Sequence, residues 1–304
     1  MSEIKAGPAS GPWATTRQVL LSSRPLSWIN TAYPFAAACL LTTGRVDALL
    51  IVGTLFFLIP YNLLMYGIND VFDYESDLRN PRKGGVEGAL LDPRVHRTVV
   101  IAGVVTSAPF LVALIVLGRD SSPWAWLVLA LSLFAVVAYS APGLRFKEVP
   151  FLDSITSSIH FVSPAVFGLV LTGATFTPAL IAVLVAFFFW GTASHAFGAV
   201  QDVGPDREAG IGSIATVLGA SPTVRLSLSL WAAAGALMLV TPWPGPIFAV
   251  LAVPYILTAF PWRRVSDERS AEANAGWRRF LWLNYACGFV VTMVLIARAF
   301  ALAI

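Results

Sequence analysis

Two short acidic segments carry residue types and spacings that could do chemistry. Asn69-Asp70-Val71-Phe72-Asp73-Tyr74-Glu75-Ser76-Asp77 ends a long apolar run, and Asp202-Val203-Gly204-Pro205-Asp206 ends another far downstream. Carboxylates gathered at the edge of an apolar layer repel one another unless they are protonated or bridged by cations. Mg²⁺ is a hard ion that binds carboxylate oxygen and keeps coordination positions for phosphate oxygens. The two segments therefore predict a magnesium site that could hold a diphosphate.

The spacing within the first segment predicts a single helical face. A helix turns by about 100° per residue, so residues four apart lie nearly above one another. Asn69, Asp73 and Asp77 follow that spacing, and Asp70 falls near the edge of the same sector. Ca²⁺ could use the same oxygens, but the spacing of an EF-hand loop is missing after Asp77.

The second segment repeats the four-residue spacing. Asp202 and Asp206 would share a face, although Gly204 and Pro205 between them predict that the helix frays there. Both segments together give the expected metal ligands, which are Asn69, Asp70, Asp73, Asp77, Asp202 and Asp206.

The composition predicts a membrane protein. Of the 304 residues, 57% are hydrophobic and only 12% are charged, which is far from the balance of a soluble domain. Apolar stretches of roughly 20 residues, long enough to cross a bilayer, can be drawn nine times. They lack the alternation of barrel strands, so an all-α polytopic protein is expected. The expected spans are residues 25–42, 47–68, 97–118, 123–140, 153–173, 177–199, 222–242, 245–262 and 280–300.

The distribution of Lys and Arg predicts the orientation. Of the 20 such residues, all but Arg45, Arg119 and Arg298 fall on one side of the nine crossings, which places the N-terminus in the cytoplasm. The acidic segments end the second and sixth spans, so both face that side. The basic rim is expected to contact anionic lipid, and no nucleic acid is invoked. We expect an N-terminal cytoplasmic tail over residues 1–24, mobile through Ala14, and one membrane domain over residues 25–304.

The chain also resembles a known family. Its two acidic segments are similar to the paired NDxxDxxxD and DxxxD signatures of the UbiA superfamily of intramembrane prenyltransferases. Residues 139–147, Tyr-Ser-Ala-Pro-Gly-Leu-Arg-Phe-Lys, are similar to a Tyr-rich turn followed by basic residues in that family. The resemblance implies a nine-helix bundle around a central cavity, in the cell membrane, with an active site that opens to the cytoplasm.

The resemblance also implies roles for individual residues. The acids would hold Mg²⁺ on an allylic diphosphate, with Asp73 and Asp202 central, and Tyr139 would steady the allyl cation. Lys83 would take part in catalysis as well. The residues implied in binding the diphosphate are Asn69, Lys83, Arg145, Lys147 and Arg207.

One histidine is a further candidate. His195 precedes Asp202 by seven residues and lies on the same helical face, so it could accept the proton that is lost when the cation adds to an alkene. The pattern favours the alternative interpretation, a hydrogen-bonded histidine within the membrane.

The acceptor is suggested by a narrower likeness. Residues 30–35, 79–88 and 280–285 resemble the actinobacterial lycopene elongases of C50 carotenoid synthesis. This implies transfer of a five-carbon group from dimethylallyl diphosphate to the acyclic end of lycopene, twice to reach C50. The spans contain almost no Lys or Arg, in keeping with an apolar polyene, and Lys83 leads into Gly84-Gly85 where quinone-pathway members carry an Arg-Pro pair.

Other functions stay open at this point. The acceptor could be a quinone precursor, haem, chlorophyllide or another lipid. A cation-coupled secondary transporter would also use membrane acids, but its usual sign is an inverted repeat, whereas these segments repeat on one side. The sequence does not choose between proton loss and water for quenching the product cation, and it leaves association with other carotenoid-pathway enzymes open.

Overall fold

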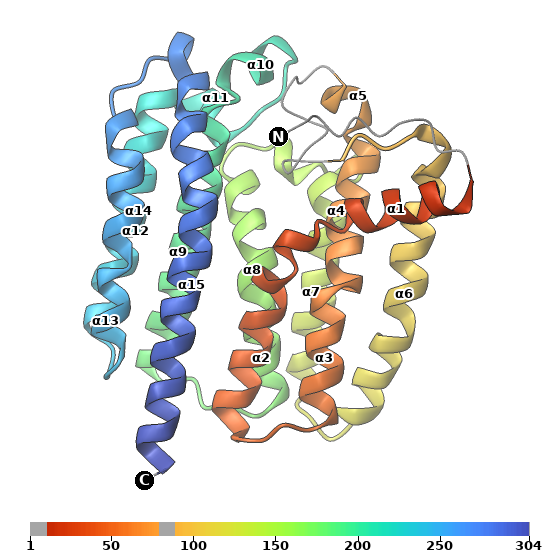
Figure 1. Cartoon of the computed structure of the whole chain (residues 1–304), viewed down its shortest axis with the longest axis vertical. Coiled ribbons are helices and arrows are strands. Elements are labelled where there is room, and N and C mark those ends of the chain that lie inside the picture. Colours follow the sequence, from red (N-terminus) through yellow and green to blue (C-terminus); the bar gives the residue numbers. More distant parts are fainter. Residues whose placement is uncertain (1–10, 79–88, 304) are drawn as a thin grey trace. The chain divides into compact units, whose positions relative to one another are not determined.

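The computed structural model describes residues 11–78 and 89–303, and all regular structure in these ranges is helical (Figure 1). The all-α expectation is therefore confirmed for this part of the chain. The residues form two compact units. Unit 1 comprises residues 1–146 and 159–174, and unit 2 comprises residues 147–158 and 175–304. Each unit contains one of the two acidic segments.

Unit 1 is built around α4, which contacts α1, α3, α6 and α7. Its buried core is rich in aromatic rings, including those of Phe35, Phe57 and Phe167. The helices of unit 1 are α1 (Pro12–Ser22), η1 (Pro25–Ser27), α2 (Ile29–Thr43), α3 (Ala48–Leu58), α4 (Pro60–Phe72), α5 (Tyr74–Asp77), η2 (Pro93–Val95), α6 (His96–Leu117), α7 (Pro123–Ser140) and the second part of α8 (Leu152–Leu171).

A proline divides one apolar stretch of unit 1 into α3 and α4. Pro60 lacks the N–H that would continue the helix, which leaves preceding carbonyls in need of donors. The Asn62 side chain supplies them, because its Nδ2 donates to Phe57 O at 2.8 Å and to Leu58 O at 3.1 Å. The same nitrogen lies 2.7 Å from Thr31 Oγ1 on α2. The buried amide thus joins α3 and α4 and fixes α2 against them.

Unit 2 packs α9 against α12, with α14 and α15 completing the core. Trp190 on α9 stacks on Phe280 of α15, with ring centroids 6.3 Å apart, and meets Tyr255 of α14 edge-on at 5.9 Å. The helices of unit 2 are the first part of α8, α9 (Pro178–Val200), α10 (Val203–Glu208), α11 (Ile214–Leu218), α12 (Ala220–Leu239), α13 (Gly245–Val250), α14 (Ala252–Ala259), η4 (Phe260–Trp262), η5 (Asp267–Ala273) and α15 (Asn274–Ala303), while η3 (Phe146–Glu148) lies at the boundary between the units.

Membrane-spanning length is reached by 8 helical segments of the described chain. Each coincides with one of the nine predicted spans, which confirms a multi-pass membrane protein. They are Ala48–Phe72, Pro93–Leu117, Pro123–Ser140, Leu152–Leu171, Pro178–Val200, Ala220–Leu239, Gly245–Trp262 and Asp267–Arg298. The first predicted span, residues 25–42, corresponds to α2, whose 15 residues are fewer than the roughly 20 needed to cross a bilayer. Nine crossings and a cytoplasmic N-terminus therefore stay predictions.

The predicted N-terminal tail contains a helix. α1 begins at Pro12, inside the stretch through Ala14 that we expected to be mobile, and it contacts α4 and α6. Gln18 is buried, and its Oε1 accepts the backbone N–H of Asp92 at 2.9 Å. Residues 12–22 are thus packed onto unit 1. The division into a tail over residues 1–24 and one domain over residues 25–304 stays a prediction.

Candidate functional site

The first acidic segment continues the backbone of α4 across its end. Asp73 follows the last residue of α4, and its N–H bonds to Asn69 O at 2.9 Å. The N–H of Asp77 bonds in turn to Asp73 O at 2.8 Å. Asn69, Asp73 and Asp77 therefore follow one another at single helical turns, as their spacing predicts. Its three aspartates are buried, with exposed fractions of 1% for Asp70, 7% for Asp73 and 6% for Asp77, whereas Glu75 is exposed.

An arginine that the sequence reasoning did not select is bound to Asp70. The Arg24 Nη2 lies 3.0 Å from Asp70 Oδ1, and its guanidinium lies 4.3 Å from the centroid of the Tyr66 ring. Burial is the largest single effect and disfavours the charged guanidinium, but the combined attraction to Asp70, Tyr66 and Asp77 and the hydrogen bond to Asp70 outweigh it, so the pKa of Arg24 is raised above its usual value. The clue in the sequence is that Arg24 directly precedes the first apolar stretch, on the side expected to carry the acids.

The turn after α7 brings a second arginine to the segment. Arg145 Nη2 lies 3.7 Å from Asp73 Oδ1, and Arg145 adopts a left-handed backbone with φ of 43°. Ser140, the last residue of α7, donates through Oγ to Asn69 Oδ1 at 3.0 Å. The Tyr-rich turn thus contacts both the amide and one acid of the segment.

Tyr139 packs against a buried histidine of the same unit. Its ring meets that of His160 edge-on, with centroids 5.2 Å apart. Lys147 is half-buried in η3. Lys83, assigned to the diphosphate from sequence, lies outside the described residues.

The second acidic segment reproduces the local backbone of the first. Asp73 has φ of −98° and ψ of −2° at the end of α4, and Asp202 has φ of −98° and ψ of 0° just beyond α9. A short helix follows each of them. The N–H of Asp206 bonds to Asp202 O at 2.8 Å, the same distance as between Asp77 N and Asp73 O. Asp202 and Asp206 thus match Asp73 and Asp77 in local geometry.

The predicted fraying at Gly204 and Pro205 is wrong, because both residues belong to helix α10. Pro205 lies in the first turn of α10. Proline is tolerated there because the N–H groups of a first turn lack partners within the helix.

Arg207 is held by its own unit. Its Nε and Nη2 donate to Thr216 O at 3.1 and 2.8 Å, and its Nη1 lies 2.6 Å from Asp267 Oδ2. These contacts fix α10 to α11 and η5. Its assignment to the diphosphate stays a prediction, and such a role would require these contacts to be shared or broken.

His195 lies in a polar cluster that the sequence reasoning missed. Ser154 Oγ on α8 is 3.0 Å from His195 Nδ1. The neighbouring Asp153 is fully buried, interacts electrostatically with the imidazole, and accepts the backbone N–H of Ile214 through Oδ2 at 3.0 Å. The adjacent Asp153-Ser154 pair in a largely apolar stretch was the available signal.

A close approach of α8 and α9 brings Ser154 and His195 together. A Cβ added at Gly191 would lie 2.4 Å from Ser158 Oγ, so a larger residue there would force Ser158 to shift. Ser158 Oγ also donates to Phe188 O at 2.8 Å. Ser154 lies one turn before Ser158, and His195 lies one turn after Gly191. Because the two antiparallel helices pair Ser158 with Gly191, they also pair Ser154 with His195.

The side-chain oxygens of the acidic segments are suitable ligands for Mg²⁺. Carboxylate and amide oxygens are the ligands that this hard ion prefers, and three buried carboxylates in Asp70, Asp73 and Asp77 call for cationic neighbours. Within residues 11–78 and 89–303, three or more His, Cys, Asp or Glu side chains are nowhere gathered around one point as a formed metal site. Arg24 and Arg145 instead contact two of the acids of unit 1.

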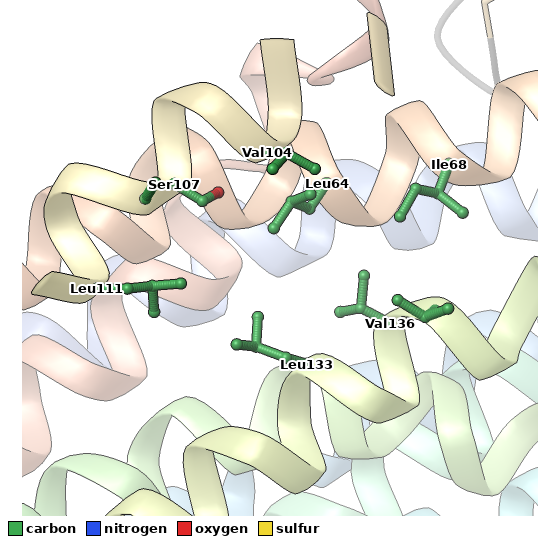
Figure 2. A pocket seen from close by; sticks show the side chains of 9 residues that line it. Leu64, Ile68, Val104, Ser107, Leu111, Leu133 and Val136 are labelled. Carbon is green, nitrogen blue, oxygen red and sulfur yellow. The ribbon is translucent and has the colours of Figure 1, made fainter. Parts of the chain in front are cut away.

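An apolar hollow of about 230 Å³ lies between α4, α6 and α7 (Figure 2). Leu64 and Ile68 line it from α4, Leu111 from α6 and Leu133 from α7, and Ser107 is the single polar residue among those that line it. Without a charged group it cannot bind a diphosphate. The polar chemistry of unit 1 is therefore at the end of α4 and not in this hollow.

The family comparison agrees with the fold and the acidic segments. Residues 31–284 match the model of the UbiA prenyltransferase family. The chain belongs to this family, which confirms the resemblance drawn from the two acidic segments. It is a membrane prenyltransferase, and the transporter alternative is set aside.

The chain is also similar to individual proteins of known name and to a solved structure. The chain is 52% identical over 282 residues to a lycopene elongase/hydratase of Corynebacterium glutamicum, covering 92% of this chain and 97% of that protein. It is 31% identical over 290 residues to a lycopene elongase/hydratase of Halobacterium salinarum, covering 91% and 96%. In fold it resembles a UbiA homolog from Archaeoglobus fulgidus bound to DMAPP and Mg²⁺, with a TM-score of 0.63, 20% identity, and coverage of 89% and 98%.

Proposed function

We propose that this prenyltransferase moves a dimethylallyl group from dimethylallyl diphosphate to the acyclic end of lycopene, once at each end, in C50 carotenoid synthesis. The observation that supports dimethylallyl diphosphate as the donor is the shared backbone geometry of Asp73 and Asp202. Each follows a long membrane helix, has the same backbone conformation, and is followed one turn later by a second acid. Two such segments are suited to a diphosphate held through metal ions.

Mg²⁺ is the proposed cofactor. When bound, it would neutralise the diphosphate oxygens and make diphosphate a better leaving group. Arg145, whose Nη2 lies 3.7 Å from Asp73 Oδ1, is proposed to bind phosphate oxygens through its planar guanidinium. The proposed ligands are Asn69, Asp70, Asp73, Asp77, Asp202 and Asp206. A solved UbiA homolog bound to DMAPP and Mg²⁺ supports the same pairing of donor and metal.

The acceptor is inferred from the named relatives and from the spans. Proteins that are 52% and 31% identical to this chain are called lycopene elongase/hydratase. The spans carry almost no Lys or Arg, so the membrane interior offers little to bind a charged head group, and a hydrocarbon polyene suits it. The hydratase part of those names leads us to propose water as the nucleophile that quenches the product cation. The proposed setting is the cell membrane, with the acidic segments facing the cytoplasm.

The experiment combines pigment analysis with product release. The full chain is expressed in a host that accumulates lycopene, and the pigments are analysed by mass. We expect lycopene to be converted into products enlarged by one and by two five-carbon units. The purified protein should release pyrophosphate from dimethylallyl diphosphate only when both Mg²⁺ and lycopene are present.

Three further outcomes test the acceptor, the metal site and the host separately. Unchanged lycopene from well-expressed protein, with pyrophosphate release restored by a quinone precursor, would replace the acceptor and keep the transferase. Release of pyrophosphate at full rate in the presence of a chelator would contradict the metal site. An enlarged pigment in cells that lack the protein would show that the host makes it.

A further inference from the structure

One polar cluster is not explained by binding of the donor. His195, Ser154 and Asp153 lie together in unit 2, where two membrane-spanning helices approach each other. Ser154 and Asp153 are fully buried, and His195 is half-buried. Buried polar groups in a membrane span are costly and commonly serve function. The cluster therefore calls for a role besides packing.

Its position relative to the second acidic segment suggests that role. His195 lies on α9, five residues before that helix ends at Val200, and Asp202 follows two residues beyond the end. His195 is therefore roughly 8 Å inside the span that leads to Asp202. If Asp202 marks the level of the diphosphate, His195 lies in the direction in which the allyl group and the reacting alkene extend from it.

We propose that His195 is the general base that takes a proton from the water molecule that quenches the product cation. This inference rests on the proposed function. The allylic C–O bond breaks and its electron pair leaves with diphosphate, and the π pair of the acceptor alkene forms the new C–C bond. A tertiary cation remains on the acceptor. A lone pair of water forms the C–O bond to that carbon, and the proton released goes to His195.

Ser154 and Asp153 position and support this base. When Nδ1–H of His195 donates to Ser154 Oγ, Nε2 carries the lone pair that can accept a proton. The buried Asp153 carboxylate stabilises the imidazolium that results, and its own place is fixed by the N–H of Ile214. Ser154 is thus a positioning residue, and its effect should appear in the product and not in donor ionisation.

The test follows the fate of the cation. Purified wild-type protein, His195→Gln, Ser154→Ala and Ser158→Ala are each given dimethylallyl diphosphate, Mg²⁺ and lycopene in ¹⁸O-labelled water. Pyrophosphate release and the labelled hydroxyl in the product are both measured. Ser158→Ala is the matched control, because Ser158 lies one turn from Ser154 and bonds a backbone carbonyl.

We expect one labelled oxygen per added five-carbon unit from wild-type protein and from Ser158→Ala. His195→Gln should still release pyrophosphate but give mainly unlabelled alkene, and Ser154→Ala should give a mixture. An unchanged labelled fraction in His195→Gln would overturn the proposal. If that variant does not fold, an unchanged fraction in Ser154→Ala overturns it instead. Unlabelled wild-type product with normal pyrophosphate release overturns this inference and the proposed quenching by water but leaves the prenyl transfer intact, whereas no release from wild-type protein overturns the proposed transfer with it.

Discussion

Asp73 and Asp202, which are far apart in the sequence, have the same backbone conformation, with φ of −98° in both and ψ of −2° and 0°. Each lies between a long membrane helix and a short one. The equivalence is one of local backbone geometry within each unit. It is the basis on which we propose the same role for both segments.

The first prediction follows from this equivalence. Asp73→Asn and Asp202→Asn should lower Mg²⁺-dependent pyrophosphate release to a similar degree. Loss of groups that only orient metal ligands costs about 10- to 100-fold, so loss of a ligand should cost at least about 100-fold. The controls are Glu75→Gln, which removes an exposed acid within the first segment, and Glu208→Gln, which removes an exposed acid just after the second. Near-normal release by either aspartate variant would refute the metal site at that segment.

The second prediction concerns the hydrogen bond between Ser140 and Asn69. Ser140→Ala removes the donor that holds Asn69 Oδ1 at 3.0 Å. The Mg²⁺ concentration that gives half-maximal activity should rise about 10-fold, because the amide is no longer oriented. Ser132→Ala is the control, since Ser132 is also buried on α7 but bonds only Val128 O of its own helix. Equal magnesium requirements in the two variants would remove Asn69 from the ligand set.

The third prediction concerns the ion pair between Arg24 and Asp70. Arg24→Ala leaves the Asp70 carboxylate buried without its guanidinium, which should lower the free energy of unfolding by about 3 kcal/mol, the lower end of the range because Arg24 is partly exposed. Thermal unfolding in detergent measures the change. The double variant with Asp70→Asn should recover most of the loss. If the double variant is as unstable as the single one, the arginine stabilises by packing and not by charge.

The fourth prediction concerns Gly191. In Gly191→Ala the new methyl group would meet Ser158 Oγ, and relieving such a clash costs about 1–3 kcal/mol. Adding Ser158→Gly should restore much of the stability. Gly288→Ala, where a Cβ meets no atom within 4 Å, serves as the control. A stable Gly191→Ala variant would show that α8 and α9 separate easily.

Periodic and local features were predictable from the sequence. The membrane helices follow from long apolar stretches, and the single-turn spacing of Asn69, Asp73 and Asp77 follows from helix geometry. The prediction that the helix frays at Pro205 was wrong, because the sequence did not show that Pro205 lies in the first turn of α10. The predicted span 25–42 begins before α2, since the apolar stretch there includes η1.

The partners of the site residues could not be predicted. Arg24 and Asp70 are 46 residues apart, Asn69 and Ser140 are 71 apart, and Ser154 and His195 are 41 apart. Each pair depends on how two segments that are distant in the sequence pack against each other. That alignment is set by side-chain packing over many turns, which the hydropathy pattern does not record.

The packing of Gly191 on Ser158 also determines which changes in chain length the protein can tolerate. The connection from Thr172 to Thr177 joins α8 and α9 at the far end from His195, so inserted residues there need not move the histidine. A single residue inserted between Gly191 and His195 would turn the imidazole by about 100° and carry it away from Ser154. We therefore expect insertions and deletions among functional relatives to occur in the connection and to be absent from these two helical turns.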